Sequence, residues 1–349
     1  MSLIHSRPRQ HRGLSMIEVM VGLLIGMISV LAIMRVFSLS EASRRTTSGG
    51  SDAQTNGTLA MYQLQRDLKQ SGAGINRRMF GCTVTLRAGI AVSQFAPITI
   101  NHPSIPAGDA NTDTLLLISS TSSGAPEGAA VVGQPGQSQY SVQAPNAFAT
   151  GDRVLALRQT LPSPCTLTAE AVTATAVSPA PLVTVATGVS GMSNGRLYNL
   201  GATPMAMAYA VRGGNLTACD LMASNCLATA SASNATVWVP IASNIVTLRA
   251  QYARDGSSPM DGIIDTYDQT SPTTDCGWTR VLGARIVVVG RSAQYEKGSV
   301  TASANPAWAG SSGAPITLSG TGWDHYRYKL FETMATSRNV AWIGVVPGC

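Results

Sequence analysis

A long apolar segment near the N-terminus constrains this chain more than any other feature of its sequence. Residues 14–34 read LSMIEVMVGLLIGMISVLAIM and contain one charged residue, Glu18. At ~1.5 Å per residue, a helix of this length spans ~30 Å, about the thickness of the hydrocarbon core of a bilayer. The preceding basic segment is expected to remain in the cytoplasm. The sequence therefore predicts a single-pass helix whose C-terminal side is exported.

Three interpretations of this segment compete. A secretory signal peptide would share the basic start, with Ser38 and Ser40 as a small-residue cleavage site. A plain signal anchor would explain the length of the apolar run. Neither gives Glu18 a role, although a carboxylate inside the bilayer costs roughly 2.5–3.5 kcal/mol on insertion scales. The third interpretation assigns a role to that carboxylate.

The sequence GLSMIEVMVGLLIG at residues 13–26 resembles the class III signal of type IV pilins and type II secretion pseudopilins. The resemblance implies that a prepilin peptidase cuts between Gly13 and Leu14, methylates Leu14 and leaves the helix attached. It also implies that Glu18 pairs with the N-terminal amine of a neighbouring subunit and sets the register of the filament. The simpler alternative is that Glu18 only reaches the membrane interface.

A second helical segment and a β-rich region follow. In TLAMYQLQRDLKQSGAG, at residues 58–74, Met61, Leu64 and Leu68 keep helical spacing, which predicts an apolar side packed on a sheet with Asp67 and Lys69 exposed. Glycines at positions 49, 50 and 57 are expected to weaken a continuous helix, and those at 72 and 74 to end it. Short apolar runs predict strands at 114–119, 153–159, 182–187, 206–212, 244–252, 285–292 and 326–335. Residues 120–150 and 300–322, which are rich in small residues, are predicted to be long loops.

Several phrases along the chain resemble minor pilins of the PilW type. They are LQRDLKQSGAG at 64–74, NTDTLLL at 111–117, YAVRGGNLTAC at 209–219, NIVTLRAQY at 244–252 and YRYKLFETMATSRNV at 326–340. The resemblance implies an α+β, type IV pilin-like fold in which a long N-terminal helix packs on an antiparallel, β-rich globular domain with long loops. Its parts would be a leader at 1–13, a helix at 14–72 with its transmembrane half at 14–34, and the globular domain at 75–349.

The same resemblance implies a function in assembly. The chain would be held in the inner membrane with a periplasmic globular domain, would join other minor pilins and the major pilin to prime pilus polymerisation, and would then lie at or near the tip. It could present a large adhesin there. Two alternatives stay open: a J-type pseudopilin of type II secretion, and a membrane-anchored adhesin or binding protein outside any filament.

Six cysteines all follow the apolar segment, which suggests disulfides formed in an oxidising periplasm. There is no C-x-x-C pair, so redox and zinc-ribbon sites are disfavoured. Fifteen pairings are possible. The short loop Cys219–Cys226 is the easiest to defend, whereas Cys82–Cys165 and Cys276–Cys349 are guesses.

An acidic segment, DGSSPMDGIIDTYD at 255–268, is a candidate calcium-binding site. Hard oxygen ligands on a turning loop are what Ca²⁺ needs, but the spacing does not match an EF-hand. An Asx-rich turn between strands is the favoured interpretation, and a calcium site is the alternative. The four candidate ligands are Asp255, Asp261, Asp265 and Asp268.

Nothing in the sequence indicates an enzyme, a nucleic-acid binder or a small-molecule site. His102 and His325 have no metal-ligand spacing, and neither a G-x-S-x-G elbow nor a phosphate-binding G-x-x-x-x-G-K loop occurs. The net charge of +6 weakens as a sign of nucleic acid, because Arg7, Arg9 and Arg12 lie in the leader and their removal leaves +3. Calcium aside, no cofactor is expected.

Overall fold

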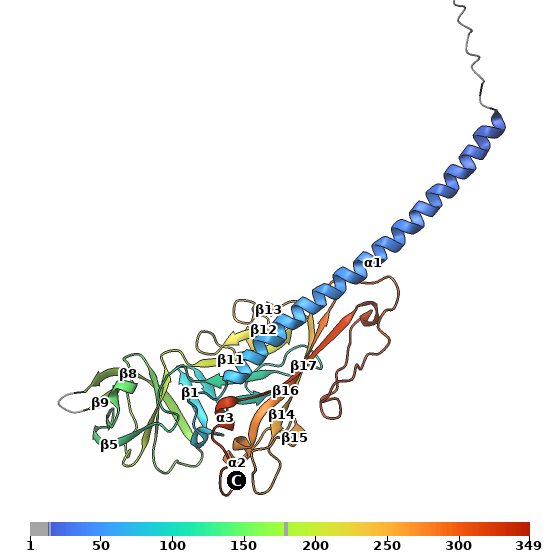
Figure 1. The fold of residues 1–349 in the computed structure, drawn as a ribbon. Helices are drawn as coiled ribbons and strands as arrows, with labels where there is room; N and C mark the ends of the chain where they lie inside the picture. The colour runs from blue at the N-terminus through green and yellow to red at the C-terminus, as the bar shows by residue number, and fades with distance from the viewer. Residues whose placement is uncertain (1–12, 14, 178–180) are drawn as a thin grey trace, which may run out of the picture. The chain divides into compact units, whose positions relative to one another are not determined.

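The computed structural model describes residue 13, residues 15–177 and residues 181–349; at positions 42 and 45 it describes the backbone alone. The chain forms two units, of which the first ends at Gly49 and the second comprises Gly50–Cys349. One helix, α1 (Met16–Gln70), contains 55 residues and continues from the first unit into the second (Figure 1). The glycines at 49 and 50 therefore mark the boundary between the units without interrupting the helix.

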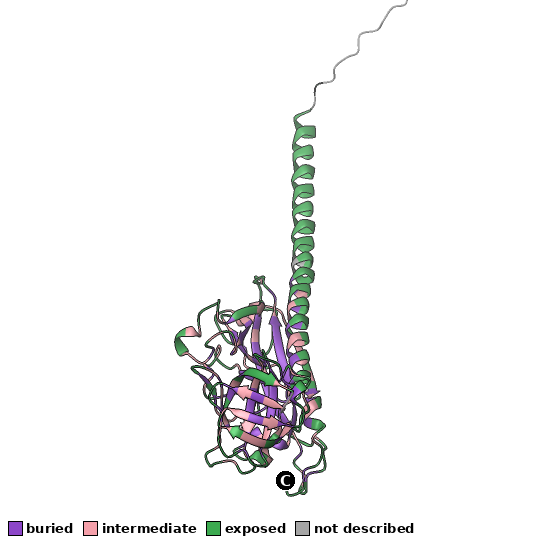
Figure 2. Cartoon of the chain, turned by 90° about the vertical axis from the view of Figure 1, so that its left-hand side faces the viewer, coloured by how far each residue is buried: buried purple, intermediate pink, exposed green. Residues whose placement is uncertain are grey.

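The last third of α1 packs on the β-rich domain through its apolar side. Ala60, Leu64 and Leu68 are buried in the same hydrophobic core as residues of the surrounding strands, and Figure 2 shows buried residues along several of these strands. At Gly57 the packing is very close, because a Cβ there would lie 2.0 Å from Cε2 of Phe331. This glycine, expected from sequence to weaken the helix, instead lets an aromatic ring lie against the helix backbone. The helix ends where Gly72 adopts a φ of 80°, in the left-handed region that favours glycine.

Two antiparallel sheets share this core with α1. The four-stranded sheet has the order β15–β14–β16–β17, and the five-stranded sheet has the order β13–β12–β11–β4–β3. The bounds of the first are β14 (Ile245–Arg254), β15 (Thr266–Asp268), β16 (Val281–Arg291) and β17 (Tyr328–Thr336). The bounds of the second are β3 (Ile98–Ile100), β4 (Leu115–Ser119), β11 (Met205–Arg212), β12 (Asn215–Asp220) and β13 (Val239–Ala242).

A third sheet closes on itself. Its order is β2–β1–β8–β7–β10–β5–β6–β9, and β8 also pairs with β9, so six antiparallel strands form a ring. This ring, residues 129–201, is called the barrel below. Its interior is a separate hydrophobic cluster that includes Tyr140, Val172 and Met192. The bounds are β1 (Thr83–Arg87), β2 (Ile90–Val92), β5 (Ala129–Gly136), β6 (Gln139–Val142), β7 (Arg153–Leu157), β8 (Thr166–Ala176), β9 (Leu182–Val185) and β10 (Arg196–Gly201).

The two predicted loops have different outcomes. The prediction for 120–150 was wrong in part, because β5 and β6 lie there and belong to the barrel (Figure 1). Residues 300–322 are irregular, as expected, but they pack: Trp308, Ile316 and Leu318 are buried on Val287 and Val289 of β16. The short helices are η1 (Arg77–Met79), η2 (Pro145–Ala147), η3 (Thr229–Ser231), α2 (Asp275–Thr279), η4 (Trp323–His325) and α3 (Arg338–Ala341).

Candidate functional site: the N-terminal helix and its attachment to the sheets

The first turn of α1 uses Glu18 as part of a capping box. The backbone N–H of Ser15 donates to Oε2 of Glu18 over 3.0 Å, and the backbone N–H of Ile17 donates to Oγ of Ser15 over 3.3 Å. These bonds satisfy donors that an uncapped helix start leaves open. Sequence reasoning missed this role, although Ser15 followed three residues later by Glu18 is its signature. Leu14, the residue expected to be methylated, lies outside the described residues.

The helix beyond this cap has an apolar surface on every side. Large apolar side chains from Met16 to Leu39 are 47–84% exposed, and the segment is long and apolar enough to cross a membrane. A helix that is apolar all round needs lipid or other helices as its surroundings. This surface is the candidate site for membrane anchoring and for helix-to-helix assembly.

In the second unit, Asp67 connects α1 to β11. The expectation that Asp67 is exposed was wrong: the residue is 2% exposed, because it lies three positions after Leu64 on the buried side of the helix. The Tyr209 hydroxyl donates to Oδ2 of Asp67, which also accepts from Nε2 of Gln63 over 3.0 Å. Nε of Arg66 donates to the other oxygen over 2.8 Å. Burial and the hydrogen bond to Asp67 raise the pKa of Tyr209 above its usual 10.

We expect Tyr209→Phe to destabilise the protein at neutral pH by about 1.5–3 kcal/mol, the usual contribution of a hydrogen bond to a charged group. A tyrosine with a raised pKa stabilises the fold fully below pH 10, and this contribution is lost as the pH rises from 10 toward the folded-state pKa. The difference in the free energy of unfolding between wild type and Tyr209→Phe should therefore become smaller above pH 10. Urea unfolding of the full chain in detergent, followed by tryptophan fluorescence at pH 7 and pH 10.5, measures both effects. If this difference in unfolding free energy stayed constant or grew with pH, the stabilising role of the Tyr209–Asp67 hydrogen bond would be contradicted.

A second polar contact joins the two sheets. Oδ1 of Asp113, just before β4, pairs with Nη1 of Arg249 on β14 over 2.7 Å, and their side chains are 3% and 14% exposed. Asp113 also accepts from Asn101 over 2.9 Å, from the backbone N–H of Ala250 over 2.9 Å and from Gln269 over 2.6 Å. These two residues belong to the phrases NTDTLLL and NIVTLRAQY. Each phrase therefore supplies one of the two residues of this buried ion pair.

Comparison with known families bears on both ends of this architecture. Residues 8–34 match the prokaryotic N-terminal methylation motif, and residues 208–339 match the family described as type IV pilus-assembly protein W, PilW. The chain thus carries a PilW-family region at residues 208–339. No curated protein and no solved structure matches it. The comparisons thus confirm the PilW-type resemblance found in the sequence, and the long helix on antiparallel sheets confirms the expected α+β fold.

The two matched regions cover different parts of the fold. The methylation motif covers the capping box and the first part of the apolar helix, whereas the PilW match runs from β11 to α3 and includes Tyr209 and Arg249. The barrel lies in neither region. PilW is a structural pilin family and not an enzymatic one, and its members take part in pilus assembly.

Three disulfides staple the β-rich domain. They join Cys82 to Cys165, Cys219 to Cys226 and Cys276 to Cys349, which are the pairings set out from the sequence. The first links the segment after α1 to the barrel, and the third holds the C-terminal residue beside α2. Each closes a loop and so restricts the unfolded chain.

The acidic segment is organised as a turn. The buried carboxylate of Asp255 accepts from the backbone N–H groups of Ser257, Asp261 and Gly262. Asp265 accepts from the backbone N–H of Gly256. Asp268 pairs with Arg254 over 2.8 Å. Among the residues that the structure describes, no group of three or more His, Cys, Asp or Glu is placed to hold a metal ion. The carboxylates therefore have the arrangement of the Asx-rich turn.

The two histidines in the described part of the chain, His102 and His325, have structural roles. His102 is 2% exposed, its Nδ1 accepts from the backbone N–H of Ser104 over 3.1 Å, and its Nε2 donates to the carbonyl of Ser93 over 2.6 Å. Burial lowers the pKa of His102, so the ring is neutral at pH 7. His325 stacks on Tyr295, with ring centroids 4.6 Å apart, and donates from Nδ1 to the carbonyl of Glu296 over 2.8 Å. Both rings therefore stabilise loops by hydrogen-bonding to their backbone groups.

Proposed function

We propose that this chain is a minor pilin that helps to prime type IV pilus polymerisation in a complex with other minor pilins at or near the tip. One observation supports it most: a methylation-type N-terminus leads into a helix with an apolar surface on every side, followed by a disulfide-stapled domain with a PilW-family region. Such a helix can leave lipid for a bundle of similar helices without exposing its surface to water.

The proposed pathway follows from this arrangement. Residues 1–13 are a leader that prepilin peptidase removes between Gly13 and Leu14, and Leu14 is then methylated. Before assembly the chain stays in the inner membrane, with its disulfide-bonded domain in the oxidising periplasm. In the filament, Glu18 would pair with the N-terminal amine of a neighbouring subunit and set the register.

We expect the mature protein to begin at methylated Leu14. The capping box supports a helix that starts directly after this site, at Met16. Mass spectrometry of the N-terminal peptide from membranes and from sheared pili measures the start. Gly13→Val, which adds a branched side chain at the cut, should leave the leader attached. A wild-type start near Glu41, or an intact Met1, would contradict the proposal.

The role in pilus priming is tested by deleting the gene. Surface pili should be lost, and they should return with the wild-type gene but not with Gly13→Val. If the protein were a J-type pseudopilin, the deletion strain would lose protein secretion instead. If it were an adhesin outside the filament, the deletion strain would lose attachment while its number of pili stayed normal.

A further inference from the structure

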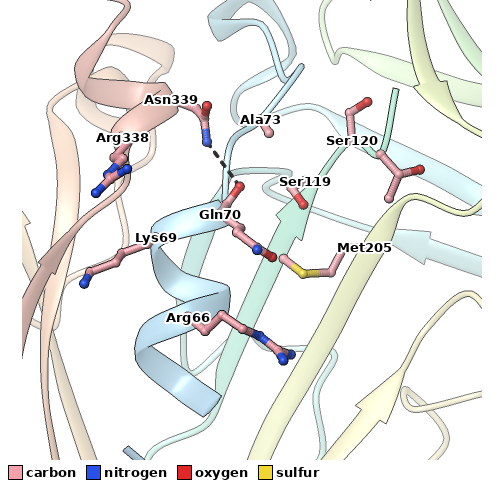
Figure 3. A pocket seen from close by; sticks show the side chains of 10 residues that line it. Arg66, Lys69, Gln70, Ala73, Ser119, Ser120, Met205, Arg338 and Asn339 are labelled. Atoms are coloured by element: carbon pink, nitrogen blue, oxygen red, sulfur yellow. Dashed lines mark hydrogen bonds between the residues drawn. The ribbon is translucent and has the colours of Figure 1, made fainter. Parts of the chain in front are cut away.

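The last turn of α1 lines a hollow in which every charged side chain is basic. The hollow has a volume of about 680 Å³ and lies between α1, the end of β4, the start of β11 and α3 (Figure 3). Its charged lining residues in the described part of the chain are Arg66, Lys69 and Arg338, and no acidic residue lines it. We call it the basic hollow.

The fold itself compensates little of this charge. Arg66 bonds to Asp67, yet 48% of its side chain stays exposed, and that carboxylate also serves Tyr209 and Gln63. The C-terminal end of α1 favours nearby cations, which accounts in part for Arg66 and Lys69. Arg338 has no such explanation, because it is exposed on α3, a helix of four residues that is too short for a helix dipole to favour a charge of either sign.

A second hollow adjoins the basic hollow and shares Asn339 with it. Its volume is about 480 Å³, and its lining includes Trp342 and one residue of each charge, Arg77 and Glu127. Trp342 is 89% exposed, the largest exposed fraction among the exposed large apolar side chains that the structure describes. Tryptophan and arginine together are the residues that most often dominate binding at protein interfaces. Their adjacency here indicates a surface for a polypeptide partner.

We propose that the basic hollow and Trp342 bind an acidic segment of another subunit of the same filament. The segment would place two or more carboxylates against Arg66, Lys69 and Arg338 and an apolar side chain on Trp342. Charge complementarity identifies the occupant as acidic, and the neighbouring aromatic favours a peptide over a bare anion. The inference rests on the proposed function only for the identity of the partner.

A photo-crosslinking amino acid at position 70 tests this contact in the full-length chain, because the Gln70 side chain lines the basic hollow (Figure 3). It is expressed in piliated cells that lack the wild-type copy. We expect a crosslink to another pilin subunit, in a peptide with at least two Asp or Glu residues identified by mass spectrometry. The triple variant Arg66→Glu, Lys69→Glu and Arg338→Glu should reduce it about tenfold or more. Reversing the charge of the acidic residues in the partner peptide should then restore it.

The control is Lys297→Glu, which reverses an exposed lysine outside the basic hollow and should leave the crosslink unchanged. If the triple variant does not reach wild-type levels, Arg338→Gln alone should still weaken the crosslink. A crosslink to lipid, to a second copy of this chain or to a peptide without acidic residues would overturn the proposal, as would insensitivity to every charge variant. The N-terminal mass from the same cells separates the two failures, because a chain that starts at Leu14 keeps the proposed function even where this site fails.

Discussion

Asp113→Ala is expected to lower the free energy of unfolding by about 3–5 kcal/mol, the usual cost of removing one partner from a buried ion pair. Arg249 would remain with a side chain that is only 14% exposed and without its carboxylate. The donors on Asn101, Gln269 and the backbone of Ala250 would lose the same acceptor. Urea unfolding of the full chain in detergent, followed by tryptophan fluorescence, measures the loss.

The matched control for this change is Asp109→Ala. Asp109 accepts from the backbone N–H groups of Gly213 and Gly214 at an exposed turn, and it lies outside the buried pair. It should cost about 1 kcal/mol, the net contribution of ordinary hydrogen bonds. Equal costs for the two variants would show that the Asp113–Arg249 pair does not hold the sheets together. The double variant Asp113→Ala and Arg249→Met should be more stable than Asp113→Ala alone, because no buried charge is left unpaired.

The second large effect concerns assembly. We expect the amount of Glu18→Ala in sheared pili to be at least about tenfold lower than that of wild type. The proposed pair of Glu18 with a neighbouring N-terminal amine would lie in a water-free helix bundle, where charge pairs are strong. The leader of Glu18→Ala should still be removed, since the variant keeps Gly13 and Leu14. Quantitative immunoblots of pili and of membranes, normalised to each other, measure the loss.

The control is Ser29→Ala, which removes another polar side chain from the same helix. Oγ of Ser29 donates to the carbonyl of Ile25 within the helix, so this change should leave incorporation unaltered. Glu18→Gln separates charge from capping, because an amide oxygen can still accept the Ser15 N–H. Wild-type incorporation of Glu18→Gln would show that the capping box suffices and that no charge pair is needed.

The sequence was most informative where local pattern and burial agree. All the predicted strands occur, from β4 at 115–119 to β17 at 328–336, because each has apolar residues of its own to bury. The helical stripe through Leu64 and Leu68 was also correct. The exposure of Asp67 was predicted wrongly. Its spacing from Leu64 places it on the buried side of the helix, but the partner that a buried carboxylate needs, Tyr209, is 142 residues away in sequence.

The barrel shows why the remainder could not be predicted. Its strand β8 reads TLTAEAVTATA and β5 reads AAVVGQPG, so neither carries a strong apolar pattern. Their strand character comes from closing the ring, through pairings such as Val172 with Val185. Likewise, the basic hollow joins residues from α1, β4, β11 and α3 that no local window contains.

The attachment of the barrel has a mechanical consequence. In sequence the barrel lies between β4 and β11, which are neighbours in one sheet, so the chain enters and leaves the barrel at one place. The parallel pairing of β1 with β8 is a further contact between the barrel and the remainder of the domain. The Cys82–Cys165 bond adds a third covalent tether, which reaches the segment directly after α1. A load applied to the barrel would then be shared by three covalent connections and the β1–β8 pairing, two of which lead to the segment after α1. Reducing this bond would leave the β1–β8 pairing to carry load from the barrel to that segment, while the barrel's own ring stays closed.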